Sequence, residues 1–504
     1  MSPLASTFCS LSVSPSSVSV PGDETYTAQN SQHWSGTTIL SPCLIFTPSS
    51  TSELSAGLQH LVSTNTPFAV RNGGHMPNNS WSSVDNGVMI SMEKFAGIEY
   101  DTATEVAKIG AGLRWKDVFA SMAKYGRAVN GGTNGAPSVG GLTLGGGIGY
   151  YHNRLGYTAN GVVNFEVVLS SGKVVNANAS ENPDLFWALR GGGNNLGIVT
   201  QLDFTTVPTE SGVWAGTMIF VGAAYNPAIE AMNEFINNHS HDEDVSIMFT
   251  SRPGMLVAVM FHDGDAAGKR PEAFERFKKI GPMVDTVALT TVAEMGKKSA
   301  ESSPNGLRRY FNTLTVKKDT QLLSTLIQQY EQGLQRENLG AQVEGFAPHF
   351  AVMTLTHNFL EKSKHGPAAV SDPNGDELIC IVQLSTWRNA SDDELVHAAT
   401  EKITQELQAT AENQGALNPF IFMNHAGVKQ DVFGGYRKEN VDKLREVAGR
   451  YDPDGVFQTL LKGGFKLGFL KEAPVARLYA PDAIFETLLK GGFEAGLREE
   501  TVCV

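Results

Sequence analysis

The sequence predicts an α+β protein built from two packed units. Between residue 43 and about residue 208, short runs rich in β-branched residues alternate with short helical segments. Between residue 213 and about residue 415, strand patterns alternate with longer amphipathic helices, which is typical of an antiparallel sheet covered by helices. A chain of 504 residues is long enough for two or three such units.

The composition is that of an ordinary globular protein, with 41% hydrophobic and 18% charged residues. The formal net charge of −13 argues against a nucleic-acid-binding surface, because such a surface needs clustered cations. No apolar run approaches the ~18 residues of a membrane span. We therefore expect neither a nucleic-acid partner nor a membrane.

The first segment, residues 1–37, is rich in Ser, Thr and Pro and is expected to be an extended lead-in. It contains no Lys or Arg and no apolar stretch of signal-peptide length, so the chain as written predicts no secretion signal and a cytoplasmic location. The cysteines Cys9, Cys43, Cys380 and Cys503 share no metal-ligand spacing, and we expect no metal site. Cys9 and Cys43 could form a disulfide or be unrelated thiols.

The elements of the first unit, assigned to residues 38–209, follow in order. Residues 42–75 predict a strand, a helix, a second strand and a glycine turn, and "TSEL" offers the helix a Thr cap and an early acid. Further strands are predicted in "GVMISM", "VAKIGAG", "VVNFEVVLSSGKVVNA" and "GIVTQLDFTTV".

The second unit is assigned to residues 210–418. Its predicted strands include "GTMIFVG", "VSIMFTS" and "LVAVMFH", and its longest predicted helices are "DTQLLSTLIQQYEQGLQ" and "DDELVHAATEKITQELQATAENQ". A closing segment, 419–470, contains a helix that ends before Pro453, because the residue before a proline leaves helical space. In the tail, 471–504, residues 479–498 repeat residues 451–470, which indicates a duplicated terminal element.

Glycine is concentrated in "RNGGH" at 71–75, "NGGTNGAPSVGGLTLGGGIGYY" at 130–151 and "LRGGGNNLGIV" at 189–199. Glycines allow the backbone to approach a ligand closely, and successive N–H groups in such loops suit phosphate. Neither later cluster fits G-x-G-x-x-G, because Tyr150 and Leu196 stand where the third glycine is needed, and no P-loop sequence is present. The clusters predict a ligand site of another kind.

Five motifs carry a family resemblance: "RNGGH", "IGAGLRWKDVF", "VGGLTLGGGIG", "NPDLFWALRGGGNNLGIVT" and "YDPDGVFQ". They resemble the berberine-bridge-enzyme-like FAD-linked oxidoreductases, which have a PCMH-type (vanillyl-alcohol-oxidase-type) FAD-binding domain. The resemblance runs from about Cys43 to Leu467. It implies an FAD-binding domain of two α/β subdomains, completed by the closing segment, and an antiparallel-sheet substrate domain over the flavin. By family analogy the protein would be secreted.

The resemblance also implies how FAD is held. In relatives, the histidine of R-x-G-G-H bonds covalently to the 8α-methyl carbon of the flavin, and His75 occupies that position. A neutral imidazole is a competent nucleophile near pH 7. The residues assigned to FAD binding are Arg71, Asn72, Gly73, Gly74, His75, Gly131, Gly132, Thr133, Asn134, Ser138, Gly140, Gly141, Leu144, Gly145, Gly146, Gly147, Gly149, Gly197, Ile198, Val199 and Asn424.

Many relatives attach the flavin a second time, through a cysteine in the second glycine cluster. Asn134 stands at that position here, and an amide cannot form a thioether. We therefore expect attachment through His75 alone. Ser138, where glycine is usual, and Leu196, where an aromatic residue is usual, are milder departures.

Flavin chemistry on a donor carbon needs a group that removes a proton. Relatives commonly use a tyrosine in an N-Y-x-D stretch; here Asn424 matches, but His425 replaces the tyrosine and Gly427 the acid. His425 could be the base, since the reference pKa of histidine is near 6.5, or it could only line the pocket. Further candidates are Gln383 and Tyr151 for catalysis and Trp387, His349 and His357 for contact with the substrate.

These observations predict an FAD-dependent oxidase that takes a hydride from a small apolar secondary-metabolite intermediate to flavin N5 and uses O₂ to reoxidise the flavin. Two alternatives stay open. The first is a flavin-bound cyclase that closes a reactive polyene or polyketide without net redox change, and the second is a ligand-binding member without turnover.

Overall fold

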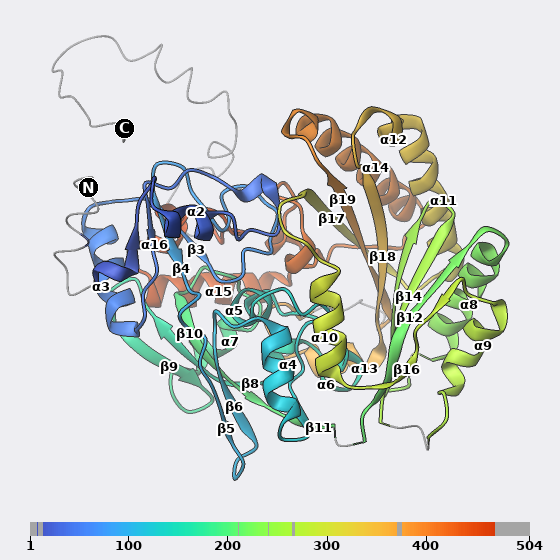
Figure 1. Cartoon of the computed structure of the whole chain (residues 1–504), viewed down its shortest axis with the longest axis horizontal. Helices are drawn as coiled ribbons and strands as arrows, with labels where there is room; N and C mark the ends of the chain where they lie inside the picture. Colours follow the sequence, from blue (N-terminus) through green and yellow to red (C-terminus); the bar gives the residue numbers. More distant parts are fainter. Residues whose placement is uncertain are drawn as a thin grey trace.

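The structure is a computed structural model, and it describes residues 8, 14–209, 211–239, 241–264, 268–369 and 375–468. Figure 1 shows two lobes side by side, the first built from the beginning and the end of the described chain and the second from its middle. The predicted α+β class, with antiparallel sheets and helices, is confirmed.

The first lobe contains a four-stranded sheet in the order β1-β2-β4-β3. The three strands β2, β3 and β4 run parallel, as expected of apolar strands buried on both faces. One helix, α3 (Thr51–Ser63), packs its apolar side on this sheet. The strands are β1 (Val18–Ser19), β2 (Leu44–Phe46), β3 (Phe68–Arg71) and β4 (Val88–Ser91).

Residues 14–37 are not the extended lead-in that their composition suggested. The strand β1 pairs with β2, and the helix α2 (Glu24–Asn30) packs beside it, with the Tyr26 hydroxyl donating to the carbonyl of Pro42 at 2.7 Å. Serine and proline outnumber the apolar residues of this segment, but its few apolar side chains join the core of the first lobe.

The cap of α3 differs from the prediction by one residue. Ser50, not Thr51, accepts the hydrogen bond from the Glu53 amide at 3.2 Å. The Glu53 carboxylate in turn accepts from the amides of Ser49 and Ser14, both at 2.7 Å. This is a capping box shifted by one position, and it also ties the N-terminal segment to the helix.

A second sheet of the first lobe is antiparallel, in the order β5-β6-β10-β8-β9. Its strands are β5 (Ile98–Asp101), β6 (Val106–Gly110), β8 (Val162–Val168), β9 (Val174–Asn178) and β10 (Ile198–Thr205). The elements that accompany this sheet are α4 (Trp115–Ala123), α5 (Val139–Leu144), α6 (His152–Leu155), α7 (Pro183–Leu189) and the pair β7 (Arg127–Ala128) and β11 (Val207–Pro208). The second glycine cluster contains α5 and the loops on both sides of it, and the third lies in the loop before β10.

The second lobe is one large antiparallel sheet in the order β15-β12-β14-β13-β18-β19-β17-β20, with β16 paired to β12. Its strands are β12 (Val213–Val221), β13 (Val245–Arg252), β14 (Met255–Asp263), β15 (Val284–Asp285), β16 (Ala288–Thr290), β17 (Arg308–Lys317), β18 (Ala347–Leu355), β19 (Leu378–Trp387) and β20 (Leu417–Asn418). One face of the sheet is turned to the first lobe (Figure 1).

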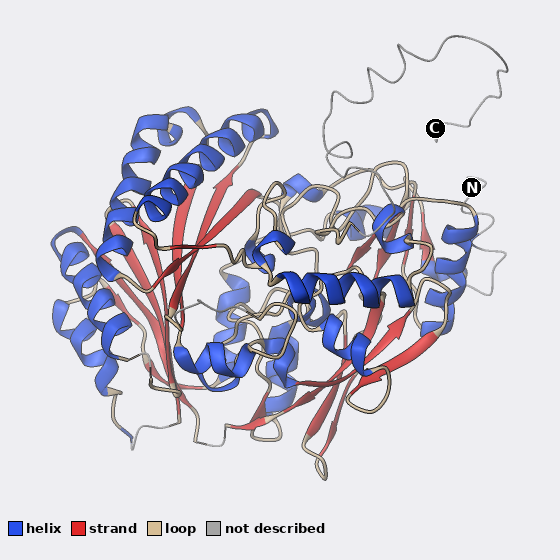
Figure 2. Cartoon of the chain, turned by 180° about the vertical axis from the view of Figure 1, so that it is seen from behind, coloured by secondary structure: helices blue, strands red, loops and turns tan. Residues whose placement is uncertain are grey.

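Helices cover the outer face of this sheet, as Figure 2 shows from behind. They are α8 (Tyr225–Asn238), α9 (Glu272–Ile280), α11 (Thr320–Glu337), α12 (Leu339–Gln342) and α14 (Asp393–Asn413). Between the lobes, α10 (Val292–Glu301) packs against α4, and α13 (His357–Ser363) packs against α6.

The closing segment returns to the first lobe. The helix α15 (Lys438–Tyr451) ends before Pro453, and α16 (Val456–Thr459) follows. The Phe68 amide of β3 donates to the carbonyl of Leu460 at 3.0 Å, and the Lys462 amide donates to the carbonyl of Phe68 at 2.7 Å. These bonds extend the parallel sheet with the end of the described chain.

Cys9 and the repeat copy at 479–498 lie outside the described residues, so the structure tests neither the Cys9–Cys43 disulfide nor the role of the repeat. Among the helices that the structure describes, none is both long and apolar enough to cross a bilayer.

Candidate active site at the junction of the two lobes

A cavity of about 480 Å³ lies where the two lobes and the closing segment meet. The first lobe supplies the glycine-rich loops, the second lobe supplies the inner face of its sheet, and the closing segment supplies residues 422–425, 461, 464 and 465. A volume of this size is in the range of cofactor and ligand sites. The sheet contributes mostly apolar side chains: Met248, Phe311, Ala351, Met353, Val382 and Leu384.

Fifteen of the residues assigned to FAD line this cavity. They come from all three glycine clusters and from the closing segment, which the fold brings to one place. They are Asn72, Gly73, Gly74, His75, Thr133, Asn134, Ser138, Gly141, Leu144, Gly145, Gly147, Gly197, Ile198, Val199 and Asn424.

The loop after β3 carries His75 to the cavity wall. Gly73 makes this possible, because a Cβ there would lie 2.8 Å from the amide nitrogen of Ser138 in the second glycine cluster. The imidazole of His75 stacks on the indole of Trp34, with centroids 4.1 Å apart and planes 12° from parallel. Burial lowers the pKa of His75 well below its usual value, and the charges of Arg114 and Arg309 add to the effect. His75 is therefore neutral.

Trp34 links the loop of His75 to the second lobe. Its amide donates to the carbonyl of Gly74 at 3.0 Å, and its own carbonyl accepts from the amide of Gly306 at 3.1 Å and from the guanidinium of Arg309. The Arg309 guanidinium also lies 4.2 Å from the centroid of the indole. His75 and Arg309 are both too close to the Trp34 ring to share one of its faces. We infer that they lie on opposite faces, with Trp34 between them.

Arg71 does not face the cavity, which corrects its assignment to FAD binding. Its guanidinium is buried and bonds the hydroxyl of Ser91 at 2.8 Å, the carboxylate of Glu93 at 3.2 Å and the carbonyl of Gln29. The side chain fixes the end of β3 and the N-terminal segment, because alternate strand residues point to opposite faces.

Five of the assigned glycines also lie off the cavity wall: Gly131, Gly132, Gly140, Gly146 and Gly149. Protein atoms, not a ligand, approach them closely. A Cβ on Gly131 would lie 2.4 Å from the Trp115 ring, and one on Gly149 would lie 1.9 Å from the carbonyl oxygen of Gly131. These glycines therefore allow the second glycine cluster to pack closely against the protein, and neighbouring residues of the cluster line the cavity.

Two asparagines on the wall have their amides engaged by the protein. The Asn134 side-chain oxygen accepts from the amide of Ala136 at 2.8 Å, which folds the loop locally. The Asn424 side chain accepts from the amide of Gly147 at 3.3 Å and donates to the carbonyl of Leu142 at 2.9 Å. Asn424 thereby ties the closing segment to the second glycine cluster.

His425 lines the cavity next to Asn424. Its ring meets Phe311 edge to face at 4.9 Å and lies 5.3 Å from Phe422, and its Nδ1 is enclosed without a partner in the described residues. This apolar surrounding lowers the pKa of His425 to about 4. The ring is neutral at pH 7, as a proton acceptor must be, but it titrates well below the reference value near 6.5.

The register of β19 removes Gln383 from the candidates. Val382 and Leu384 line the cavity, so Gln383 and Trp387 point to the opposite face. There the Gln383 amide donates to the Thr404 hydroxyl of α14 at 2.9 Å. Gln383 and Trp387 therefore belong to the core beneath the helices.

Tyr151 also lies off the cavity wall, which corrects its assignment to catalysis. Its ring packs edge to face against Phe261 of β14 at 5.1 Å, and burial raises the pKa of Tyr151 above its usual value. A buried phenol of this kind is a poor base. The sequence also proposed two histidines for contact with the substrate. His349 lines the cavity, whereas His357 lies at the exposed start of α13.

Sequence reasoning missed Trp34, Phe311, Met423 and Phe465, all of which line the cavity. Trp34 lies in the segment that was expected to be a lead-in. A single tryptophan in a Ser/Thr-rich stretch is the one signal that could have identified it, since large aromatic residues are rarely left without a packing role. The other three have no distinguishing sequence pattern.

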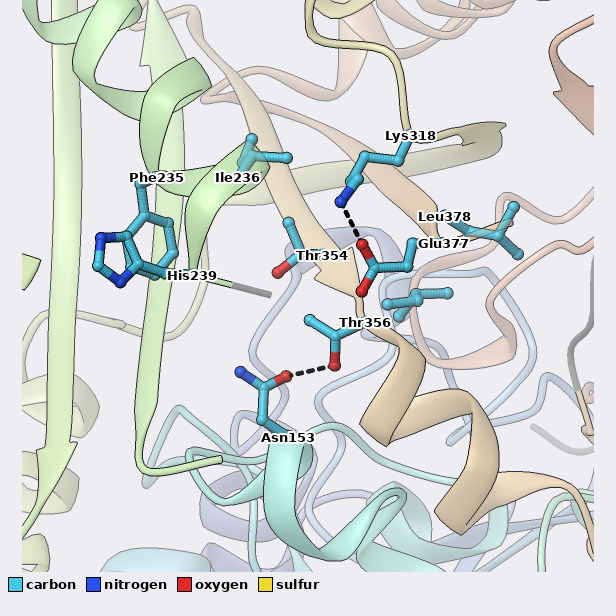
Figure 3. A pocket seen from close by; sticks show the side chains of 10 residues that line it. Asn153, Phe235, Ile236, His239, Lys318, Thr354, Thr356, Glu377 and Leu378 are labelled. Carbon is cyan, nitrogen blue, oxygen red and sulfur yellow. Dashed lines mark hydrogen bonds and ion pairs between the residues drawn. The ribbon is translucent and has the colours of Figure 1, made fainter. Parts of the chain in front are cut away.

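A second, much smaller cleft lies where α6 meets the sheet of the second lobe (Figure 3). The Thr356 hydroxyl donates to the side chain of Asn153 at 3.0 Å, and Lys318 pairs with Glu377. Its volume of about 10 Å³ holds no more than one water molecule. We therefore regard this cleft as part of the packing interface between the two lobes and not as a ligand site.

The comparisons with known proteins agree with this site. Residues 42–178 match the family model of an FAD binding domain. The chain is 33% identical over 422 residues to the FAD-dependent monooxygenase tpcD of Cochliobolus heterostrophus, covering 80% of this chain and 81% of the relative. It is 30% identical over 453 residues to the bifunctional solanapyrone synthase of Alternaria solani, covering 89% and 86%.

Two solved structures share the fold. BBE-like 1 of Physcomitrella patens aligns with a TM-score of 0.74 and 16% identity, over 92% of this chain and 100% of its own. The glucooligosaccharide oxidase of Acremonium strictum, described with a 6-S-cysteinyl, 8α-N1-histidyl FAD, aligns with a TM-score of 0.72 and 19% identity, over 91% and 98%.

Fold and site together define an FAD-linked oxidoreductase with a berberine-bridge-enzyme-like fold, which confirms the resemblance found in the sequence. The chain belongs to the family of the fungal FAD-dependent monooxygenases. It is an FAD-dependent oxidoreductase of the fungal secondary-metabolite type.

The cavity fits FAD. Several of its lining residues carry polar atoms that are enclosed and have no hydrogen-bond partner in the described residues: Trp34 Nε1, Asn72 Oδ1, His75 Nε2, Ser82 Oγ and His425 Nδ1. Unpaired buried polar atoms are costly unless a bound group pairs with them. In the described part of the chain, no group of three or more His, Cys, Asp or Glu residues is placed to hold a metal ion.

Proposed function

We propose that this protein is an FAD-dependent oxidase that carries its flavin on His75 and acts on a small apolar secondary-metabolite intermediate. One observation carries the proposal: two enclosed, neutral histidines, His75 and His425, line the same cavity, between the glycine loops and an apolar sheet face. One of them suits covalent attachment of the cofactor, and the other suits removal of a proton from the substrate.

When bound, FAD would supply the redox chemistry of the site, as the acceptor for a hydride equivalent from a carbon of the substrate, with O₂ as the final oxidant and hydrogen peroxide as its product. The chain's own residues do the rest. The glycine loops and Asn72 hold the cofactor, the apolar face around Met353 and Leu384 orients the substrate and excludes water, and His425 accepts the proton that the substrate loses.

The attachment through His75 is tested on the purified protein. We expect acid-precipitated wild type to keep its flavin, and His75→Ala to release it on precipitation. Peptide mapping should find flavin on His75 only, because the amide of Asn134 cannot form the second bond that the Acremonium oxidase is described with. Flavin in the supernatant of wild type, or an adduct on a cysteine, would refute this part of the proposal.

The oxidase reaction is tested with candidate secondary-metabolite substrates. Under anaerobic conditions the flavin should bleach once for each molecule of substrate oxidised. In air, one O₂ should be consumed and one hydrogen peroxide formed per turnover. A product that keeps the mass of its substrate and forms without O₂ uptake would instead support a flavin-bound cyclase, the alternative that the sequence left open.

A further inference from the structure

The inner face of the large sheet carries unpaired positive charge at one end of the cavity. Arg252 is the last residue of β13, and its Nη2 lies 2.8 Å from Nε2 of His349 on the neighbouring strand β18. His349 lines the cavity. Thr250, two residues before Arg252 on the same face, lines it as well. Arg252 is not itself a lining residue; its half-buried guanidinium reaches the cavity through its contact with His349.

No carboxylate within the described residues pairs with this guanidinium. Its Nε is enclosed and has no hydrogen-bond partner in the described residues, and burial lowers the pKa of Arg252 below its usual value. Arginines on the outer side of the same lobe differ: Arg270 pairs with Asp285 at 2.8 Å and Arg276 with Glu234 at 2.7 Å. The missing counter-charge is specific to the inner face.

Arg309 adds a second unpaired charge on that face. It is 4% exposed, and its guanidinium donates to the backbone carbonyls of Pro304, Leu307 and Trp34 but to no acidic side chain that the structure describes. Between the two arginines, burial lowers the pKa of His349 to about 3, and both guanidiniums add to the effect. His349 is therefore neutral, and the net charge of this cluster is positive.

We propose that this end of the cavity binds an ionised oxygen of the substrate, such as an enolate, phenolate or carboxylate, with Arg252 as its charged partner and His349 as the residue that positions Arg252. The inference rests on the proposed function, because it names the substrate class of the same cavity. The substrate is then an apolar molecule with one acidic oxygen.

The physical reason is charge balance in an enclosed place. A guanidinium beside an apolar wall has lost much of its hydration, and an anion that enters restores a charge-assisted hydrogen bond. The planar donors of arginine suit oxygen anions in particular. The apolar side chains of Met248, Ala351 and Met353, on the same strands, suit the remainder of such a molecule.

The test is equilibrium binding to the flavin-loaded protein by titration calorimetry, with 2-naphthoate and the uncharged, equally shaped 2-naphthamide as probes. Wild type should bind 2-naphthoate on the order of tenfold more tightly than 2-naphthamide, which is typical of one charge-assisted hydrogen bond. Equal affinity of wild type for the two probes would overturn the proposal. The experiment measures binding and not turnover. Failure of this proposal can therefore be told apart from failure of the proposed oxidase function.

Arg252→Met keeps the length of the side chain and removes the charge. It should lose most of the preference for 2-naphthoate and keep the affinity for 2-naphthamide, whereas Arg252→Lys should retain part of the preference. Arg276→Met, on the outer helix α9, is the matched control and should behave as wild type. An unchanged preference in Arg252→Met would overturn the assignment.

The Arg252 guanidinium could instead interact with the flavin. The absorbance spectrum of the bound flavin separates this case from an interaction with the substrate. The spectrum of ligand-free Arg252→Met should equal that of wild type. If its maxima shift while the preference for 2-naphthoate remains, the guanidinium serves the cofactor, and the proposal fails.

Discussion

The imidazole of His425 shows how the surroundings of one residue set its chemistry. The resemblance places it where relatives keep a tyrosine, and the reference pKa of histidine suggests a base that titrates near pH 6.5. In the structure, Phe311 and Phe422 flank the ring, and burial lowers its pKa to about 4. The residue is therefore ready to accept a proton at every pH at which the protein is expected to work.

If His425 is the proton acceptor, the rate of flavin reduction should be flat between pH 6 and pH 8 and should fall as the pH drops through about 4. The sign follows because protonation removes the lone pair that accepts the proton. His425→Ala should lose on the order of 10²–10⁴ in that rate and keep its flavin. His357→Ala, at the exposed start of α13, is the control. An alanine variant with a near-normal rate would contradict the role.

Trp34 gives a second prediction at this scale. If His75 carries the flavin, Trp34→Leu should slow covalent attachment of FAD to the flavin-free protein by roughly 10–100-fold, because the Trp34 ring stacks on His75 and displacements of ~1 Å can cost this much. Trp34→Phe keeps an aromatic face and should restore much of the rate. The measurement is the time course of acid-stable flavin.

Trp81→Leu removes another indole of the same cavity wall, one that packs on Phe465, and serves as the matched control for Trp34. Its attachment rate should stay close to that of wild type. Equal effects of the two leucine variants would show that Trp34 acts through general packing only.

At the scale of elements, one carboxylate shapes the turn between α15 and α16 in the closing segment. Asp452 ends α15, and its two carboxylate oxygens accept from the amides of Val456 and Phe457 at 2.9 and 2.8 Å. The same carboxylate thus caps α16 from the N-terminal side. The turn therefore accounts for two residues of "YDPDG". Asp452 is the cap, and Gly455 has a φ of +66°, which favours glycine.

Asp452→Ala should lower the free energy of unfolding by about 2–3 kcal/mol, because it leaves two buried amides without an acceptor. Asp454→Ala removes an exposed acid two residues away and should change it by less than about 0.5 kcal/mol. Denaturant titration of both variants is the measurement. Equal stabilities would mean that water replaces the cap.

Across the whole molecule, burial keeps several histidines neutral, and this links stability to pH. The pKa of His33 is lowered to about 4, chiefly by burial, as is that of His425. In the unfolded chain these rings take up protons below about pH 6.5, whereas in the folded protein they do not. The unfolded state therefore binds more protons between pH 4 and pH 6.5, and stability is lost as the pH falls through that range.

We expect the free energy of unfolding to fall between pH 7 and pH 5 by up to about 2 kcal/mol for each such histidine. The thermal midpoint measured across this range should fall in parallel. His33→Gln should reduce the dependence, and His365→Gln, at an exposed site, should not. A midpoint that rises on acidification would contradict the argument.

From the sequence alone, local patterns predicted the α+β class and the glycine loops, and the family resemblance implied the FAD domain. Strand periodicity and glycine spacing act over a few residues, and "RNGGH" places His75 directly after its turn. The family pattern also singled out His425, at the position where relatives keep a tyrosine, and the structure places it on the same cavity as His75.

Only the tertiary structure decided which of the other candidates face the cavity. Gln383 and Leu384 are adjacent in the sequence, yet one lies under α14 and the other on the cavity wall, because neighbouring strand residues point to opposite faces and the register depends on β17 and β18. The stacking of Trp34 on His75 and the contact of Arg252 with His349 join residues 41 and 97 positions apart. No local pattern encodes such contacts, since they depend on how whole sheets and loops pack.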